Sequence, residues 1–142
     1  MIIRRRVRVG TPLPRVFAYL SDFTTTTQWD PGTISTVRIS GDGGVGTRYA
    51  NTSRFLGRTT RLAYTVTDLV PGERITLRGE NATVVAYDTM TFDDTDGTTE
   101  VTYVAEFIFR GFARALAPVL APAFRRLGDA AEAGLRQALV SL

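Results

Sequence analysis

Histidine, lysine and cysteine are all missing from this chain, and its 17 basic residues are all arginine. Without histidine and cysteine there is no Ser-His-Asp or Cys-His nucleophile and no His/Cys metal site. Without lysine there is no Schiff-base chemistry. Because arginine stays protonated at ordinary pH, any acid–base catalysis must come from Asp, Glu, Tyr or bound water.

A metal site in this chain would need clustered carboxylates. The one acidic cluster is Asp93, Asp94 and Asp96, and the Asp-Gly step that ends at Gly97 indicates a hairpin turn instead. We therefore expect no metal and no other cofactor. The lack of cysteine excludes a disulfide framework and fits the cytoplasmic location that we expect.

The chain also has no apolar run near the roughly 20 residues of a membrane-spanning helix, so we expect no transmembrane segment. Its opening Met-Ile-Ile-Arg-Arg-Arg is predicted to be a strand and not a signal peptide. With 142 residues, 44% hydrophobic and 22% charged, the chain is predicted to form a single globular domain over 1–142.

The net charge is +3, and part of the excess lies at Arg4, Arg6 and Arg8, which share one face of the first strand. We interpret this face as solvated, with an anionic partner as the alternative. No aromatic residues are interleaved with these arginines, so we expect no nucleic-acid binding.

Two short helices are predicted between the first and second strands. Alternating apolar residues place the first strand over 2–10, after which Thr11 is the expected N-cap and Pro12 the first helical residue. An apolar stripe follows, and we expect it to form a wall of an internal cavity: Val16, Phe17, Leu20 and Phe23. A second short helix would carry Trp29 and end at Asp30, whose side chain would cap the turn.

The rest of the chain is predicted to form six further strands and a long helix. The strands fall near 34–41, 46–56, 58–69, 73–80, 83–93 and 98–110, and their short connections make neighbours antiparallel. A short helix is expected near 112–117, with a kink or restart between Pro118 and Pro122 and a main helix to about 140. The fold class is therefore α+β, with a seven-stranded curved antiparallel sheet wrapped around the C-terminal helix and a pocket between them.

Several motifs, in order along the chain, resemble the SRPBCC or START-like superfamily, in particular its polyketide cyclase/dehydrase and lipid-transport branch. They are Pro14-x-Val16-Phe17-x-x-Leu20-x-Asp22-Phe23, Trp29-Asp30-Pro31-Gly32, Gly46-Thr47-Arg48, Val70-Pro71-Gly72-Glu73-Arg74 and Gly97-Thr98-Thr99-Glu100-Val101-Thr102-Tyr103. The resemblance spans essentially the whole chain. It implies a helix-grip (START-like) fold and one START-like ligand-binding domain over 1–142. The superfamily contains carriers, receptors, cyclases and hydratases, so the resemblance leaves the activity open.

Strand alternation and the resemblance together predict which side chains face the cavity. Three tyrosines are of most interest, because a buried phenol needs a hydrogen-bond partner and would suit a ligand carrying a few oxygens. The candidate ligand-binding residues are Trp29, Tyr49, Tyr64, Tyr103, Phe107, Leu120 and Phe124. Each could instead be ordinary core, and Trp29 in particular could be a plug where the short helices meet the sheet.

Asp88 is the candidate acid or base, and its orientation depends on the strand register. If Val84, Ala86 and Met90 face inward, Asp88 does too, and burial would raise its pKa. A slip by one residue would turn Tyr87 inward and leave Asp88 in solvent.

We expect the protein to bind or carry a hydrophobic small molecule, such as a lipid, isoprenoid or aromatic polyketide-like compound. One alternative is a cyclase or dehydratase that uses Asp88 or a tyrosine. Another is a non-catalytic regulatory or partner-binding module that uses the arginine-rich first strand or the C-terminal helix. The missing histidine and lysine favour binding over catalysis. A monomer and a homodimer are both compatible with the sequence.

Overall fold

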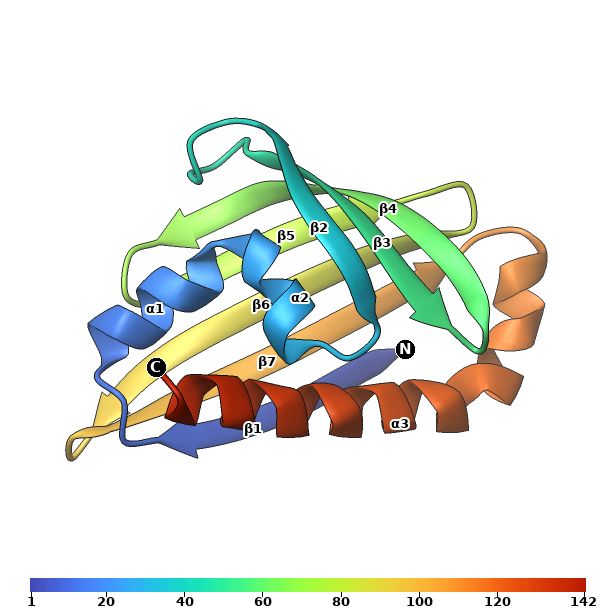
Figure 1. Cartoon of the computed structure of the whole chain (residues 1–142). Coiled ribbons are helices and arrows are strands. Elements are labelled where there is room, and N and C mark those ends of the chain that lie inside the picture. Colours follow the sequence, from blue (N-terminus) through green and yellow to red (C-terminus); the bar gives the residue numbers. More distant parts are fainter.

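The computed structural model describes residues 1–142 and shows a curved sheet closed on one side by a long helix (Figure 1). The strands are β1 (Ile2–Val9), β2 (Thr33–Ser40), β3 (Arg48–Phe55), β4 (Arg58–Val70), β5 (Arg74–Glu80), β6 (Val84–Thr95) and β7 (Thr98–Phe109). The helical elements are α1 (Leu13–Ser21), the 3-10 turn η1 (Phe23–Thr25), α2 (Thr26–Trp29) and α3 (Phe112–Val140). The predicted helix-grip arrangement is confirmed.

The seven strands form one antiparallel sheet in the order β1-β7-β6-β5-β4-β3-β2. Tight turns join the strands from β3 onward, and the acidic cluster lies at one of them. Asp96 and Gly97 both have positive φ, 52° and 78°, as a two-residue hairpin of the type I′ kind requires. The interpretation of this cluster as a turn is confirmed. A register shift between Val66 and Asp68 in the β4–β5 ladder adds to the curvature of the sheet.

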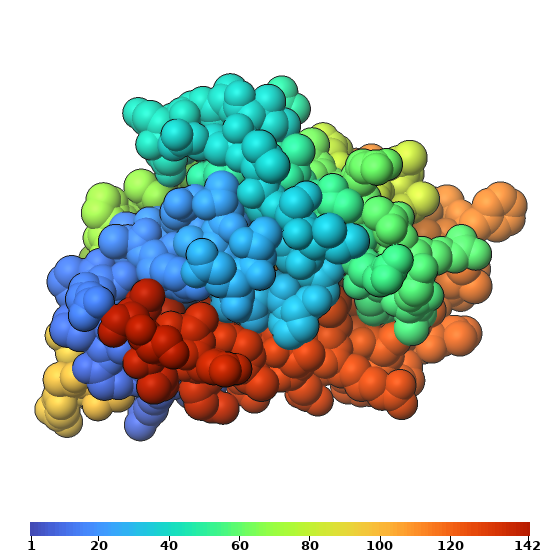
Figure 2. All heavy atoms as spheres, in the orientation of Figure 1, coloured from blue at the N-terminus to red at the C-terminus, as the bar shows by residue number.

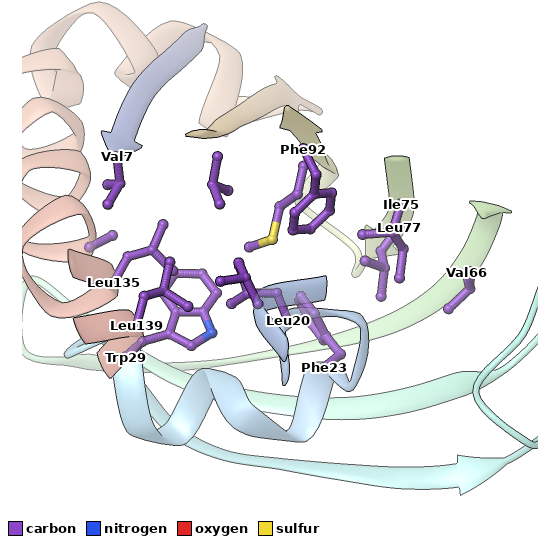
Figure 3. Packing of buried hydrophobic residues seen from close by; sticks show 14 of the residues in the cluster. Val7, Leu20, Phe23, Trp29, Val66, Ile75, Leu77, Phe92, Leu135 and Leu139 are labelled. Atoms are coloured by element: carbon purple, nitrogen blue, oxygen red, sulfur yellow. The ribbon is translucent and has the colours of Figure 1, made fainter. Parts of the chain in front are cut away.

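One end of the molecule is solidly packed. Leu135 and Leu139 of α3 are fully buried there against Trp29 and Leu20 (Figure 3). The approach is close because residue 134 is glycine: a Cβ at Gly134 would overlap the carbonyl oxygen of Trp29. On the face shown in Figure 2, the C-terminal turns of α3 lie against the α1–α2 segment and close this end.

The other end of the molecule is hollow. Over its first turns α3 stands away from the sheet, so that Phe112 is 95% exposed and Val119 is 75% exposed. Only one side of this part of the helix, including Leu120 and Phe124, packs toward the strands. These turns project at one edge of the molecule (Figure 2). The cavity described below lies under them.

The restart predicted as one alternative between Pro118 and Pro122 is wrong, since α3 runs unbroken through both prolines, whereas the other alternative, a kink, is confirmed. The helix does bend in its first third (Figure 1). Each proline lacks the N–H that would bond to the carbonyl four residues earlier, at Arg114 and at Pro118. Both of those residues are exposed, so water can hydrate the freed carbonyl oxygens.

The prediction of Thr11 as the N-cap of α1 is also wrong. The helix begins at Leu13, and its N-cap residue, Pro12, makes no side-chain capping bond. The Thr11 hydroxyl instead donates a 2.7 Å hydrogen bond to the carbonyl of Leu139, in the last turn of α3. Thr11 therefore fastens the β1–α1 connection to the last turn of α3.

The apolar stripe of α1 does not form a wall of the main cavity, contrary to expectation. Val16 and Leu20 of α1 and Phe23 of η1 belong to the packed core, and Phe23 also lines a small chamber described below. Phe17 contacts Phe92 of β6 edge to face, with ring centroids 5.1 Å apart. The stripe therefore holds the closed end of the molecule together, and the cavity begins beyond it.

Candidate functional site

A cavity of about 270 Å³ lies between the concave face of the sheet and the first half of α3. It reaches the surface near Leu116, which is 55% exposed. The volume is close to the lower limit of the roughly 300–1,000 Å³ typical of small-molecule sites. Most of its walls are apolar, from strands β1, β3, β4 and β7 and from α3, and they include Ile3, Phe55, Leu62, Phe107, Leu120 and Phe124.

Four phenylalanines form the apolar end of this cavity. The ring of Phe124 lies 4.5 Å from Phe55, 4.9 Å from Phe107 and 5.5 Å from Phe109, measured between centroids. Strand alternation places Phe107 and Phe109 on one face of β7, and the same alternation places Phe55 on the concave face of β3. These rings offer a flat or flexible apolar molecule a broad contact surface.

The opposite end of the cavity is polar, and Asp88 is its centre. Asp88 is only 5% exposed, and its Oδ1 accepts a 2.8 Å hydrogen bond from the hydroxyl of Tyr103. Its neighbour Tyr87 points to the outer face, where its hydroxyl receives a 3.4 Å bond from Arg78. Of the two registers compatible with the sequence, the structure has the one with Asp88 inside.

Tyr64 reaches the same end of the cavity because the residue opposite it has no side chain. Tyr64 pairs with Gly79 across the β4–β5 ladder. A Cβ at Gly79 would lie 2.6 Å from the Tyr64 ring, so only glycine leaves the ring its present place. The glycine on β5 thus determines where the Tyr64 hydroxyl lies.

Burial changes the protonation of this group of side chains. It raises the pKa of Asp88 from 3.8 to about 6, although hydrogen bonding from Tyr103 and Tyr64 opposes the rise. The pKa values of Tyr64 and Tyr103 are raised well above 10 by burial and by the nearby carboxylate. Near neutral pH, Asp88 can therefore both accept and release a proton, while the two phenols remain protonated.

Asp30 adds a second carboxylate to the polar end. Its Oδ1 accepts from the backbone N–H of Gly32 at 3.0 Å, and its Oδ2 accepts from the Thr33 hydroxyl at 3.0 Å. The predicted capping of this turn by Asp30 is confirmed. Burial raises the pKa of Asp30, and its charge in turn helps to raise the pKa of Asp88.

A small chamber of about 40 Å³ continues from the polar end toward the packed core. The side chains that line both the cavity and the chamber are Asp30, Asn51, Ser53, Tyr64, Asp88 and Tyr103. Asn51 is held in place because it donates to the Thr36 hydroxyl at 2.9 Å and accepts from Ser53 at 2.8 Å. Trp29 also lines the chamber, and its buried Nε1–H donates to no protein atom.

Most of the candidate residues chosen from the sequence meet around this space. Tyr64, Tyr103, Phe107, Leu120 and Phe124 line the cavity, and Trp29 lines the chamber. Tyr49 lines neither. Its ring is 1% exposed and packs 5.7 Å from Phe23 in the closed core.

Sequence reasoning did not select Asp30, Asn51, Ser53 and Phe55 as site residues. Alternation along β3 does place Asn51, Ser53 and Phe55 on the face expected to line the cavity, although they were not among the chosen candidates. For Asp30 the sequence indicated only a turn, because nothing local shows that the turn faces a cavity.

No metal centre is evident, since the structure brings no three His, Cys, Asp or Glu side chains together as a set of ligands. No arginine lines the cavity or the chamber. None of the helices combines the length and hydropathy that crossing a membrane requires. The arrangement can therefore enclose an apolar molecule and place hydrogen-bonding groups at one of its ends.

Comparison with known proteins supports the same kind of fold. A sequence model of the family described as "Polyketide cyclase / dehydrase and lipid transport" matches residues 2–140. No curated protein sequence matches this chain. Several solved structures do match it in three dimensions.

The protein TTHA0849 from Thermus thermophilus superposes with a TM-score of 0.83 at 14% identity, covering 99% of this chain and 98% of its own. The Zhui aromatase/cyclase from Streptomyces sp. R1128 gives 0.82 at 15% identity, covering 98% and 93%. A START superfamily protein from Mycobacterium smegmatis gives 0.70 at 12% identity, covering 96% and 98%. At these identities the likeness establishes a START-like helix-grip fold and no particular activity.

Proposed function

Since the chain belongs to the polyketide cyclase/dehydrase and lipid transport family, we propose that it binds or carries an apolar small molecule in its internal cavity. Residues 1–142 would act as one ligand-binding domain. The class of ligand is a lipid, isoprenoid or aromatic polyketide-like compound of modest size. A cytoplasmic location and the oligomeric state, monomer or homodimer, stay predictions.

One observation carries this proposal: the cavity is apolar along its walls and polar at a single buried end. Burying apolar ligand surface contributes roughly 25 cal/mol per Å² before the cost of ordering the ligand is subtracted. Phe107, Leu120 and Phe124 would supply that contact. Tyr64, Tyr103 and Asp88 would orient a polar group of the ligand, and Trp29 would close the chamber behind it.

The test is to fill the cavity with a larger side chain. Leu120→Trp places an indole in the cavity, whereas Val119→Trp, one residue away and 75% exposed, leaves the cavity unchanged. Native mass spectrometry of freshly purified protein should detect an apolar adduct on the wild type and on Val119→Trp. Leu120→Trp should lose it. Consistently empty wild-type protein that also binds no panel of lipids and aromatic compounds would overturn the proposal.

A second candidate function is a cyclase or dehydratase, which is favoured by one specific observation. Asp88 lies inside the cavity, with a pKa of about 6 and a fixed hydrogen bond to Tyr103. Its carboxylate could take a proton from the carbon beside a ligand carbonyl. The resulting carboxylic acid could then return that proton to a β-hydroxyl, which leaves as water while the new double bond forms.

Asp88→Asn distinguishes this second candidate from simple binding. A panel of apolar β-hydroxyketones would be incubated with the wild type and the variant, and loss of water followed by mass spectrometry. The enzyme hypothesis expects turnover by the wild type and none by Asp88→Asn, even at substrate concentrations that saturate the variant. Turnover that is equal in the two proteins would remove Asp88 from the mechanism.

A further inference from the structure

The charged side chains that line the cavity and the chamber are all acidic. The chain has 17 arginines, yet none lines the cavity or the chamber, whereas Asp30 and Asp88 line both. Inside a protein, like charges repel more strongly than they do in water, because the surroundings are less polarisable. A carboxylate or phosphate on a ligand would therefore meet the buried carboxyl group of Asp88 and the half-buried one of Asp30, with no cation among the lining residues.

The residues that line the chamber include both hydrogen-bond acceptors and a hydrogen-bond donor. Carboxyl oxygens of Asp30 and Asp88 supply acceptors, and Asp88 already uses one oxygen for Tyr103. Trp29 lines the chamber and is 3% exposed, and its indole N–H is a donor that no protein atom satisfies. A buried donor without a partner is destabilising, so an acceptor that reaches it from the chamber would be stabilising.

The chamber is also small. Its volume of about 40 Å³ is room for one group the size of a water molecule. A hydroxyl group has that size, and it donates one hydrogen bond while accepting others. A ketone oxygen cannot donate, an ammonium group cannot accept, and a carboxylate is both larger and negatively charged.

Resting on the function proposed above, we propose that the chamber binds the hydroxyl group of an otherwise apolar, uncharged ligand. The hydroxyl donates to the Asp88 carboxylate and accepts from a donor on the chamber wall, and the apolar part of the ligand lies against the ring cluster around Phe124. Alcohols and phenols are therefore ligands, and the matching carboxylates are excluded.

The experiment uses two sets of probes, each with a shared apolar part and a different polar group at one end. One set is naphthalene, 2-naphthol, 2-naphthoate and 2-naphthylmethylammonium, and the other is decane, 1-decanol, decanoate and decylammonium. Affinities for the wild-type protein are measured at pH 7.5 by isothermal titration calorimetry or by displacement of a fluorescent apolar dye. We expect each hydroxyl compound to bind at least about tenfold more tightly than its carboxylate and its hydrocarbon, as for one satisfied hydrogen bond.

Two variants test whether the hydroxyl group of the ligand lies in the chamber. Asp88→Asn removes the charge, so the preference for 2-naphthol over 2-naphthoate should shrink about tenfold, whereas Asp94→Asn on the exposed end of β6 should change nothing. Trp29→Phe removes the unpaired N–H and keeps a buried ring. It should therefore lower the affinity for the hydroxyl compounds and leave the affinity for naphthalene unchanged. Thermal unfolding of each variant confirms that the fold is retained before affinities are compared.

The outcomes separate this inference from the proposed function. If the probes bind but the carboxylate or hydrocarbon matches the hydroxyl compound, the cavity binds apolar molecules and the hydroxyl site is wrong. An ammonium compound that binds most tightly would show an amine site in place of a hydroxyl site. If no member of either set binds, the proposed function fails together with the inference.

Discussion

The hydroxyl of Tyr103 donates its hydrogen bond to Asp88 along the diagonal of the β6–β7 ladder, over 2.8 Å. Asp88 faces Ala105 directly, and Tyr103 faces Met90, so the two partners are offset by two residues on the same face of the sheet. A small alanine opposite Asp88 leaves space beside the carboxylate, and the long phenol reaches across from the diagonal position. Asp88 and Tyr103 together form the centre of the polar end of the cavity.

The buried carboxyl of Asp88 makes the stability of the protein depend on pH. Its pKa is about 6 in the folded state and 3.8 as the ordinary value, so the folded state binds more protons between these values. The stabilisation is fully present below pH 3.8 and is lost as the pH rises through about 6. From a rise of the pKa from 3.8 to about 6, we expect a loss of roughly 3 kcal/mol.

Urea unfolding of the wild type and of Asp88→Asn at intervals from pH 3 to 7.5 measures this effect. The difference in unfolding free energy between the two proteins should change by roughly 3 kcal/mol in favour of Asp88→Asn as the pH rises. Asp30, whose pKa is also raised, acts in the same direction in both proteins. Asp94→Asn is the control for removal of a carboxylate on β6. If the difference in unfolding free energy between the wild type and Asp88→Asn does not depend on pH, Asp88 is not a buried ionisable group.

Tyr103→Phe should raise the pKa of Asp88 further. The hydroxyl of Tyr103 stabilises the charged carboxylate, and its removal leaves burial less opposed. The Asp88 side-chain carbon can be followed by ¹³C NMR across a pH titration, with its midpoint expected above about 6. Tyr87→Phe, on the outer face of the same strand as Asp88, should leave the midpoint in place. A midpoint unchanged by Tyr103→Phe would mean that the hydrogen bond does not form in solution.

Gly134→Ala should destabilise the protein by about 1–3 kcal/mol, as overpacking of a well-filled core does. The added methyl group would overlap the Trp29 carbonyl oxygen, a backbone atom that cannot rotate away. Gly10→Ala is the matched control, since a Cβ there meets no atom within 4 Å. Chemical denaturation compares the two. Equal stability of both variants would show that α3 and α2 are not in this close contact.

Phe124→Ala should cost about 3 kcal/mol of unfolding free energy, at the lower end of the range for truncating a buried phenylalanine. The lower end applies because one side of the ring already faces the cavity. Leu116→Ala, at a side chain 55% exposed, should cost well under about 1 kcal/mol. Urea midpoints for the two variants provide the comparison, and a Phe124→Ala cost as small as that of Leu116→Ala would contradict the ring cluster.

Much of this fold follows from local rules in the sequence. Alternation along β7 correctly places Tyr103 and Phe107 on the concave face, and the Asp96-Gly97 step correctly gives a two-residue turn. Period-2 patterns work here because one face of each strand packs inside and the other meets solvent. The sequence therefore predicts the sheet and most of the cavity wall.

Other features depended on contacts between distant parts of the chain. Thr11 lacks a capping role because its hydroxyl meets the carbonyl of Leu139, 128 residues later. Tyr49 shares a strand face with Asn51 and Ser53, yet it lies far enough along β3 to fall under Phe23 in the closed core. Alternation identifies the face on which a residue lies, but the position of α3 and η1 above the sheet decides whether that face meets a cavity or a core.

The position of Asp88 shows the same limit. Its strand carries apolar residues on both faces, so a slip of one residue would have been equally compatible with the pattern. Pairing of Asp88 with Ala105 and of Met90 with Tyr103 settles the register, and both pairs are long-range contacts. The residues next to Asp88 in the sequence do not indicate these two pairs.

The most direct test of ligand binding in the cavity is a ¹H–¹⁵N NMR titration with 2-naphthol and with 1-decanol. Residues around the cavity should shift together and saturate, among them Asp88, Tyr103, Leu120 and Phe124. Amides of the exposed residues Arg4, Arg8 and Val45, which lie outside the cavity, should stay in place. Shifts confined to the outer face of β1, or no saturable shifts with either compound, would contradict a ligand-binding cavity.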